Sequence, residues 1–221
     1  MFKTLSFKLM SVLSIVALLS ACAQPVKRPN YTAFKKSQPR SILVLPPINE
    51  TSDVAATYGM LSQMTLPLAE SGYYVVPVAV MDETFKQNGL TNPTEIQQTS
   101  PAKLREIFGA DAALYSKVSQ YGTVYRVLAS ATVVSASAKL VDLRTGDVLW
   151  QGRASASSDE GGNNGGGGLI GMLVTAAVKQ IANTLMDQSH NVAGVTSGRL
   201  LSAGPPNGLL YGPHSPKYGT D

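Results

Sequence analysis

The chain has 221 residues, with 18 basic side chains, 14 acidic ones, two histidines and a single cysteine. One thiol excludes an intramolecular disulfide, and one Cys with two distant His excludes a zinc cluster, so we expect no metal and no cofactor. The net charge of +4 comes from the N-terminal part, because from Ser41 onward there are 11 basic and 14 acidic residues, a net charge of −3. This domain lacks a basic stripe with interleaved aromatic residues, which argues against a nucleic-acid partner.

Residues 1–21 have the three parts of a secretory signal peptide. Two lysines among the first eight residues form a positive start, the apolar run Leu9–Leu19 follows, and the small residues Ser20 and Ala21 end it. The apolar run has about half of the ~20 residues that a membrane-spanning helix needs. We therefore expect a removable leader. Its removal takes 21 residues from 221 and leaves 200, enough for one domain with tails.

The end of the leader is similar to the lipobox of bacterial lipoproteins, with the residues Leu19, Ser20, Ala21 and Cys22. In that family palmitate-type chains are attached to the Cys thiol and the leader is cut before it, so the likeness implies a lipid anchor at Cys22. A generic signal peptide with a chance cysteine is the alternative. Ala23 stands where lipoproteins of the inner membrane usually carry Asp, which implies the outer membrane. We expect its periplasmic face, with exposure on the cell surface as the alternative.

Residues 22–40 predict an acylated Cys followed by a flexible basic tether, because proline and polar residues are frequent there and none is acidic. Its basic residues are Lys27, Arg28, Lys35, Lys36 and Arg40. Beside a lipid anchor such a run indicates attraction to anionic head groups, and a merely solvated linker stays open as the alternative.

The first half of the domain has a strand, helix, strand pattern. The apolar run 41–47, stopped by two prolines, predicts a strand buried on both faces. Apolar side chains at helical spacing predict a helix over 54–71, and the run 73–77 predicts a second strand. These elements form a βαβ unit, whose two strands are parallel.

Two helices and an antiparallel half follow. Residues 78–88 predict one helix, and Ser100 as N-cap with Pro101 after it and Gly109 at the other end predicts the second. Strands are then expected over 111–119, 124–128, 132–142 and 148–157, with turns near Gly122 and at 144–147. The predicted fold class is α/β, a single mixed sheet with an N-terminal βαβ unit and then antiparallel strands, packed against helices.

The C-terminal part begins with a glycine-rich loop over 161–168. An apolar stripe predicts an amphipathic helix over 169–188 that packs on the sheet. From Val195 onward glycine, proline and serine dominate, so a loosely ordered tail is expected. The predicted segments are thus 1–21, 22–40, an α/β domain over 41–194, and a tail over 195–221.

Catalytic residues are hard to assemble from this sequence. His190 and His214 lie at the end of the last predicted helix and in the tail, where no rigid scaffold would hold a general base. Asp82 and Glu83 are neighbours on a predicted helix and point in different directions, which favours a solvated acidic turn over a carboxylate pair. We therefore expect a protein that is not an enzyme.

Tyr121 and Tyr125 flank the turn predicted near Gly122, where aromatic side chains are harder to bury than inside a strand. We expect this pair to contribute to self-association. For most of the other tyrosines and for Trp150 we expect core packing, and a ligand groove or an interface anchor is the alternative.

Several segments resemble a family of bacterial lipoproteins of unknown function, typified by a meningococcal vaccine-candidate antigen. They are the lipobox, 31–35, 42–49, 56–59, 66–74, 82–89, 108–112 and 134–143. More distantly, the hairpin 142–150 is similar to one in the periplasmic domains of the curli-secretion lipoprotein CsgG and in the N-terminal domain of TolB. The resemblance implies an envelope lipoprotein, a homodimer and a CsgG-like partner, and it implies no catalytic residues.

Three classes of function stay open. The favoured one is a non-enzymatic interaction module at the outer membrane that serves assembly or transport of envelope components. The second is a small-ligand carrier or hydrolase with a pocket at the carboxyl edge of the sheet, lined by Pro46, Pro47 and Pro77. The third is a pore. Lys139 and Arg153 on the outer face of the 132–157 hairpin argue against it, because lipid-facing strands resist charges.

Overall fold

The structure is a computed structural model that describes residues 29–125, 130–160, 188–204 and 206–221. Its described elements, in chain order, are α2 (Thr32–Ser37), β1 (Ser41–Val44), β2 (Ile48–Asn49), α3 (Ala56–Glu70), β3 (Tyr74–Val75), α4 (Val78–Gln87), α5 (Pro93–Gln98), α6 (Pro101–Phe108), β4 (Ala112–Tyr125), β5 (Ser130–Asp142), β6 (Val148–Ser157) and α8 (Gln188–Leu201). The glycine-rich loop and the helix predicted over 169–188 lie outside the described residues, apart from Gln188.

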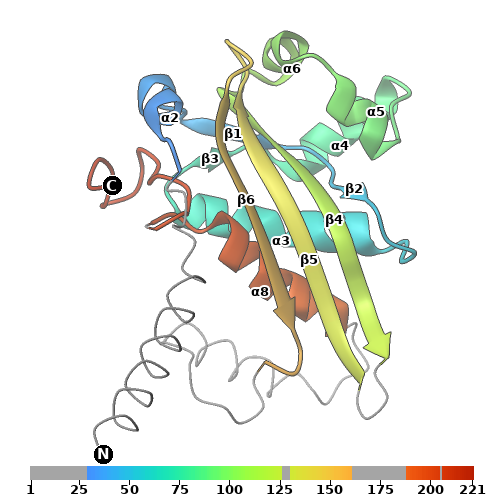
Figure 1. The fold of residues 1–221 in the computed structure, drawn as a ribbon. Coiled ribbons are helices and arrows are strands. Elements are labelled where there is room, and N and C mark those ends of the chain that lie inside the picture. The colour runs from blue at the N-terminus through green and yellow to red at the C-terminus, as the bar shows by residue number, and fades with distance from the viewer. Residues whose placement is uncertain (1–28, 126–129, 161–187, 205) are drawn as a thin grey trace, which may run out of the picture.

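One mixed sheet organises the fold (Figure 1). Its strand order is β3-β1-β4-β5-β6, and the short strand β2 pairs with β4 further along that strand than β1 does. β1 runs parallel to both β3 and β4, whereas β4, β5 and β6 form antiparallel ladders. The predicted fold class, a βαβ unit and then antiparallel strands in a single sheet packed against helices, is confirmed.

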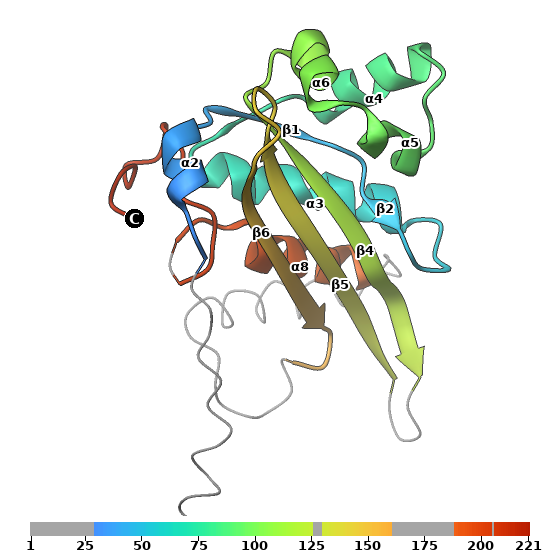
Figure 2. The ribbon, with the colours of Figure 1, turned by 45° about the horizontal axis from the view of Figure 1, so that its top comes forward.

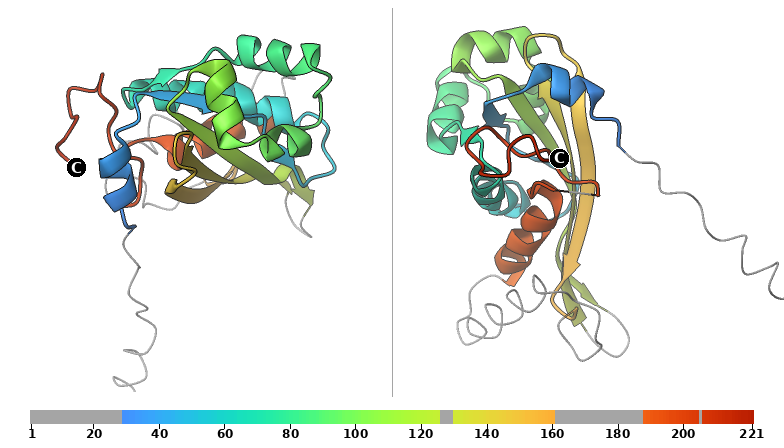
Figure 3. Two further views of the ribbon diagram at one scale, coloured as in Figure 1. Left: turned by 90° about the horizontal axis from the view of Figure 1, so that it is seen from above. Right: turned by 90° about the vertical axis from the view of Figure 1, so that its left-hand side faces the viewer.

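Helices α3 and α8 lie side by side on one face of this sheet (Figures 1 and 3). Helices α4, α5 and α6 gather beside one end of the sheet, where α5 contacts β2 and α6 contacts β4 (Figure 2). The predicted burial of the first strand on both faces is confirmed, because the run Ile42–Leu45 is almost fully buried. Helix α6 has the predicted ends: Ser100 Oγ accepts a hydrogen bond from the Lys103 N–H, and Gly109 adopts a φ of +66°.

The long strand β4 corrects the turn that was predicted at Gly122. It runs without interruption from Ala112 to Tyr125, and every residue except Ser119 pairs with β5. A register shift between Val118 and Gln120, together with a φ of +117° at Gly122, lets the strand bend here instead of reversing. The prediction was wrong because a glycine inside a strand marks an irregularity or bend as readily as a turn.

Alternation along β5 and β6 sorts their side chains between the core and the opposite face. The inward residues of β5 are buried, and they are Val134, Ala136, Ala138 and Leu140. In β6, Trp150 and Ala156 are buried, whereas Val148 is 50% exposed. The register shift between Leu140 and Val141 takes Val148 out of the inward row.

A loosely ordered tail was predicted from Val195 onward, but this residue lies inside helix α8. It continues to Leu201 and packs on α3 and on the sheet. Many of its buried residues are small or polar, and the full set is Ser189, Val192, Ala193, Thr196, Ser197, Leu200 and Leu201. Ser197 Oγ donates a hydrogen bond to the carbonyl oxygen of Gln63 on α3, at 2.8 Å. Such a composition is typical of loops, but here the small side chains allow close packing and their hydroxyls bond to main-chain carbonyls.

The residues after α8 also pack on the domain instead of forming the predicted loose tail. Leu209 and Leu210 are buried, and Tyr73 Oη donates a hydrogen bond of 2.5 Å to the carbonyl oxygen of Leu210. The tail then crosses Gly72, whose carbonyl oxygen accepts a hydrogen bond from the His214 N–H at 3.0 Å. Burial of the Tyr73 ring raises the pKa of its hydroxyl, which stays neutral and can donate. The domain therefore extends to the C-terminal residues.

The flexible tether was predicted to run to residue 40, but residues Thr32–Ser37 form helix α2. Phe34 is only 3% exposed, and its ring makes an edge contact with Tyr31, with 6.4 Å between the centroids. Tyr31 Oη donates a hydrogen bond of 2.6 Å to the carbonyl oxygen of Gly208 in the C-terminal segment. The contacts of Tyr31 and Phe34 hold this segment on the domain although most of its residues are polar or basic. Thr32–Ser37 therefore belongs to the folded domain.

The carboxylate of Asp142 ties α2 to the turn between β5 and β6. Ser37 Oγ donates to Asp142 Oδ2 at 2.5 Å, and Arg144 Nη2 donates to the same oxygen at 2.9 Å. Arg144 Nη2 also donates to the carbonyl oxygen of Ser37 at 2.8 Å. Burial disfavours the ionised carboxylate, but the hydrogen bonds from Arg144 and Ser37 outweigh burial and lower the pKa of Asp142 to about 2.

Asp142→Asn is expected to lower the free energy of unfolding at neutral pH by about 1 to 2 kcal/mol, a value reduced for solvent screening of the half-exposed Arg144. The pKa of the folded carboxyl lies below its ordinary value of 3.8, so its stabilisation is present above about pH 4 and is lost as the pH falls towards about 2. Urea titrations should show the difference between wild type and variant shrinking over that window. Asp147→Asn is the control, because within the described residues only main-chain atoms of Asp147 form hydrogen bonds. A difference that does not change with pH would contradict the expectation.

Candidate functional site

The sheet face opposite α3 and α8 is left open over β5, β6 and the part of β4 from Lys117 onward (Figure 3, right). Three cross-strand rows of side chains form the centre of this face. They are Tyr115-Lys139-Gln151, Lys117-Ser137-Arg153 and Gln120-Ser135-Ser155. Because side chains alternate along a strand, these rows are the outward counterpart of the buried rows under α8. We call these residues the open face.

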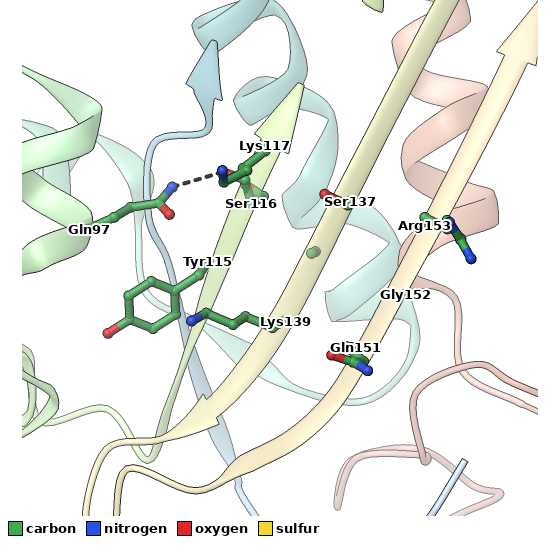
Figure 4. A pocket seen from close by; sticks show the side chains of 10 residues that line it. Gln97, Tyr115, Ser116, Lys117, Ser137, Lys139, Gln151, Gly152 and Arg153 are labelled. Atoms are coloured by element: carbon green, nitrogen blue, oxygen red, sulfur yellow. Dashed lines mark hydrogen bonds between the residues drawn. The ribbon is translucent and has the colours of Figure 1, made fainter. Parts of the chain in front are cut away.

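Three cations lie on the open face, and each has a different environment (Figure 4). Lys117 Nζ forms an ion pair with Glu50 Oε1 at 2.9 Å, between side chains that are both about half exposed. Lys139 Nζ lies 5.2 Å from the centroid of the Tyr115 ring. Burial raises the pKa of the Tyr115 hydroxyl, which therefore stays neutral beside this cation. Within the described residues, Arg153 forms no ion pair.

A shallow hollow of about 560 Å³ lies on the open face. The first two rows line it together with Gln97, which comes from α5 at its rim. Gln97 Nε2 donates hydrogen bonds to the carbonyl oxygens of Pro46 and Ser116, at 2.8 and 2.9 Å (Figure 4). This amide fixes the rim of the hollow. It also occupies the carbonyl of Pro46, one of the residues expected to line a ligand pocket at the carboxyl edge of the sheet.

The third row is hydrogen-bonded from within the chain, and one carbonyl at the free edge of β6 is occupied as well. Ser135 Oγ is hydrogen-bonded to Gln120 Oε1 and to Ser155 Oγ, both at 2.8 Å. At the edge, Arg199 Nη1 of α8 donates to the carbonyl oxygen of Ser155 at 2.8 Å, and Arg199 also pairs with Glu160 at 2.6 Å. A guanidinium that caps an edge carbonyl hinders addition of another strand there. The first two rows therefore hold the available polar groups.

The structure places the residues singled out for anchoring and self-association as follows. The lipobox residues Leu19, Ser20, Ala21 and Cys22 lie outside the described residues, so lipidation stays a prediction. Tyr121 is 7% exposed and lies inside β4 against Gly59 of α3, which corrects its expected position at an exposed turn. Tyr125 ends β4, and its side chain lies outside the described part of the chain. Self-association stays a prediction, without the exposed aromatic pair on which it was based.

The candidate catalytic residues do not converge. His190 Nε2 lies 2.6 Å from Gln63 Nε2 between α8 and α3, whereas His214 lies in the C-terminal segment beside Gly72. Asp82 pairs with Lys86 at 2.5 Å and accepts a hydrogen bond from Tyr58 Oη at 3.1 Å. Over the described ranges, no group of three or more His, Cys, Asp or Glu side chains could hold a metal ion. No helix within those ranges is long and apolar enough to cross a bilayer.

Part of the open face could be predicted, and part could not. Lys139 and Arg153 are exposed on the outer face of the β5–β6 hairpin, as expected. Their neighbours on β4 were missed, because one sequence does not show which residue of β4 pairs with Lys139. Helix α5 was missed as well, although Asn92 Oδ1, which accepts from the Thr94 N–H at 2.8 Å, and Pro93 at the first helical position are a helix-start signal.

This architecture defines the class, a mixed α/β domain whose single open sheet packs against helices. Residues 29–214 match the family described as "Putative lipoprotein GNA1162-like", and the chain belongs to this family. A relative named "Putative lipoprotein NMB1124/NMB1162", from Neisseria meningitidis serogroup B (strain ATCC BAA-335 / MC58), is 53% identical over 203 residues. That match covers 91% of this chain and 93% of the relative. The resemblance to a lipoprotein family, first seen in the sequence, is confirmed.

Among solved structures, the crystal structure of lipoprotein GNA1162 from Neisseria meningitidis is 57% identical, with a TM-score of 0.54. The match covers 66% of this chain and 100% of that chain. A PelC dodecamer from Paraburkholderia phytofirmans is 12% identical, with a TM-score of 0.42 over 79% of this chain and 91% of that chain. The LpoB C-terminal domain from Salmonella enterica is 22% identical, with a TM-score of 0.40 over 52% of this chain and 81% of that chain. The last two likenesses are too distant to carry an argument about function.

Proposed function

We propose that the chain is a lipoprotein held in the outer membrane through Cys22 and facing the periplasm. Its α/β domain acts there as a non-enzymatic binding module in the assembly or transport of envelope components. Membership of a lipoprotein family supports an anchor in the cell envelope. A homodimer and a CsgG-like lipoprotein as a neighbour belong to the same proposal, and both rest on the sequence resemblance.

The open face is the observation that carries the binding role. Ser137, Gln151 and Arg153 present side-chain donors that form no hydrogen bond within the described residues. They stand on two long, paired strands, β5 and β6, which hold their main-chain positions fixed relative to one another. The paired main chain needs no ordering when these groups bind, so only the side chains lose conformational entropy, which favours recognition of a polar partner.

Site-specific crosslinking in intact cells tests this function. A photoreactive amino acid at position 137 of the full-length protein, at the centre of the open face, is expected to form discrete adducts of higher mass. The same residue at position 62, an exposed site on α3, is the control and should give few or none. Adducts of equal yield from both positions, or none from position 137, would contradict the use of this face.

A further inference from the structure

We propose that the hollow on the open face binds an acidic glycan, a sugar polymer that carries carboxylate groups. The inference rests on the proposed function, since it assigns a ligand class to the same face. It concerns the first two rows of the open face, which surround the hollow of about 560 Å³. That volume lies within the ~300–1,000 Å³ typical of sites for small ligands and short polymer segments.

The charge of the hollow favours an anion. Lys117, Lys139 and Arg153 contribute three cations, and in the described residues only Glu50 forms an ion pair with any of them. This positive charge is local, because the chain from Ser41 onward has a net charge of −3. The guanidinium of Arg153, which has no ion pair within the described residues, is free to bind a carboxylate with two parallel hydrogen bonds.

The other side chains of the hollow favour sugar hydroxyls over a protein surface. Ser137 and Gln151 add a hydroxyl and an amide beside the cations, and these groups match a partner that is rich in hydroxyls. The one aromatic residue of the two rows, Tyr115, is only 8% exposed. Protein interfaces depend on buried aromatic and apolar anchors at their centre, and the two rows expose no large apolar side chain.

Strand addition by an acidic polypeptide is the nearest competitor, and the edge of the sheet disfavours it. Such a segment would extend the ladder at β6, the free edge next to the hollow. Arg199 of α8 already donates to the carbonyl oxygen of Ser155 on this edge. The covered acceptor shortens the ladder that a new strand could form, whereas a glycan seated on the face needs no edge carbonyl.

Calorimetric titration with defined probes tests the assignment. The protein is the mature chain from residue 22 onward with Cys22→Ser, so that the predicted lipid does not itself insert into vesicles. The probe is a short oligogalacturonate, a linear glycan with one carboxylate on each sugar. Its neutral methyl ester, a polyglutamate of equal charge, and vesicles of phosphatidylglycerol are the comparison probes. We expect the oligogalacturonate to bind at least about ten-fold more tightly than each of them, and salt to weaken its binding through charge screening.

Paired variants locate the binding. Lys139→Gln with Arg153→Gln should weaken oligogalacturonate binding by about ten-fold or more, because both cations face the hollow. Lys103→Gln with Lys217→Gln removes the same charge from other exposed positions and should change it by less than about two-fold. Lys27→Gln with Arg28→Gln removes charge from the basic N-terminal segment and should also have a small effect. Thermal melts of all variants check that the fold is retained.

Several results would overturn the inference. It fails if oligogalacturonate does not bind, if polyglutamate or vesicles bind as tightly, or if a control pair weakens binding as much as the open-face pair. Failure here is distinct from failure of the proposed function. Adducts from position 137 in cells, with no binding of the glycan probe, would retain the binding role of the face and reject the acidic glycan.

Discussion

Replacing Cys22 by serine is expected to abolish incorporation of a palmitate analogue and to leave the leader on the chain. The variant should also lose its alkali-resistant association with membranes. Each buried methylene contributes ~0.8 kcal/mol, so two palmitate-type chains contribute on the order of 20 kcal/mol, which makes the anchor stable. The apolar run Leu9–Leu19 is about half of a membrane span and cannot replace such an anchor. Metabolic labelling and fractionation of the membranes measure both effects.

Ala23→Ser is the matched control, because it changes the adjacent position and keeps the thiol. It should be labelled and should sediment with membranes as the wild type does. The intact mass of the wild-type chain after detergent extraction provides an independent check. A free thiol at Cys22 in that mass, or wild-type membrane association of Cys22→Ser, would reject the lipid anchor.

Gly72→Ala is expected to lower the free energy of unfolding by about 3 kcal/mol or more. Gly72 has a φ of +94°, a conformation that residues with a Cβ rarely adopt. An added Cβ would collide with the main-chain nitrogen of Ser215 and lie 2.8 Å from the carbonyl oxygen of Gly212. Both are main-chain atoms, so no side-chain rotation can relieve the contact. The C-terminal segment would have to move away from the domain, and urea titration measures the cost.

Gly89→Ala separates the two causes of this loss. Gly89 also has a positive φ, +76°, but an added Cβ there would meet no atom within 4 Å. The control should therefore lose only about 1 kcal/mol, the cost of the backbone conformation. Hydrogen exchange at the His214 N–H, which bonds to the carbonyl oxygen of Gly72, should accelerate in Gly72→Ala and not in Gly89→Ala. Equal losses of stability in the two variants would show that contact with the C-terminal segment adds nothing.

The βαβ half of the fold could be predicted because local patterns determine it. The run Ile42–Leu45 is apolar at every position, and only a strand covered on both faces buries it completely. Ser100, Pro101 and Gly109 set the ends of α6 through contacts within a few residues. Such signals need no knowledge of distant residues, and the structure confirms them.

The errors concern segments whose conformation depends on a distant partner. Gly122 bends a strand instead of ending it, because β5 offers thirteen paired positions to β4. Helix α8 has the composition of a loop. Its small polar residues can be buried because their hydroxyls find partners on another helix, as Ser197 does at the carbonyl oxygen of Gln63. In the sequence, Phe34 is an isolated aromatic residue in a basic segment, which predicts a tether. In the fold its side chain is buried against residues that are distant in the chain.

For the candidate site, the sequence by itself predicted the leader and the lipid anchor at Cys22, and it determined the outward position of Lys139 and Arg153, because these depend on order and period along one chain. Only the tertiary structure decided that these two cations line one hollow on the open face together with Tyr115 and Lys117. Strand register and helix coverage create that neighbourhood. Both are set by contacts between segments far apart in the chain, which no local pattern specifies.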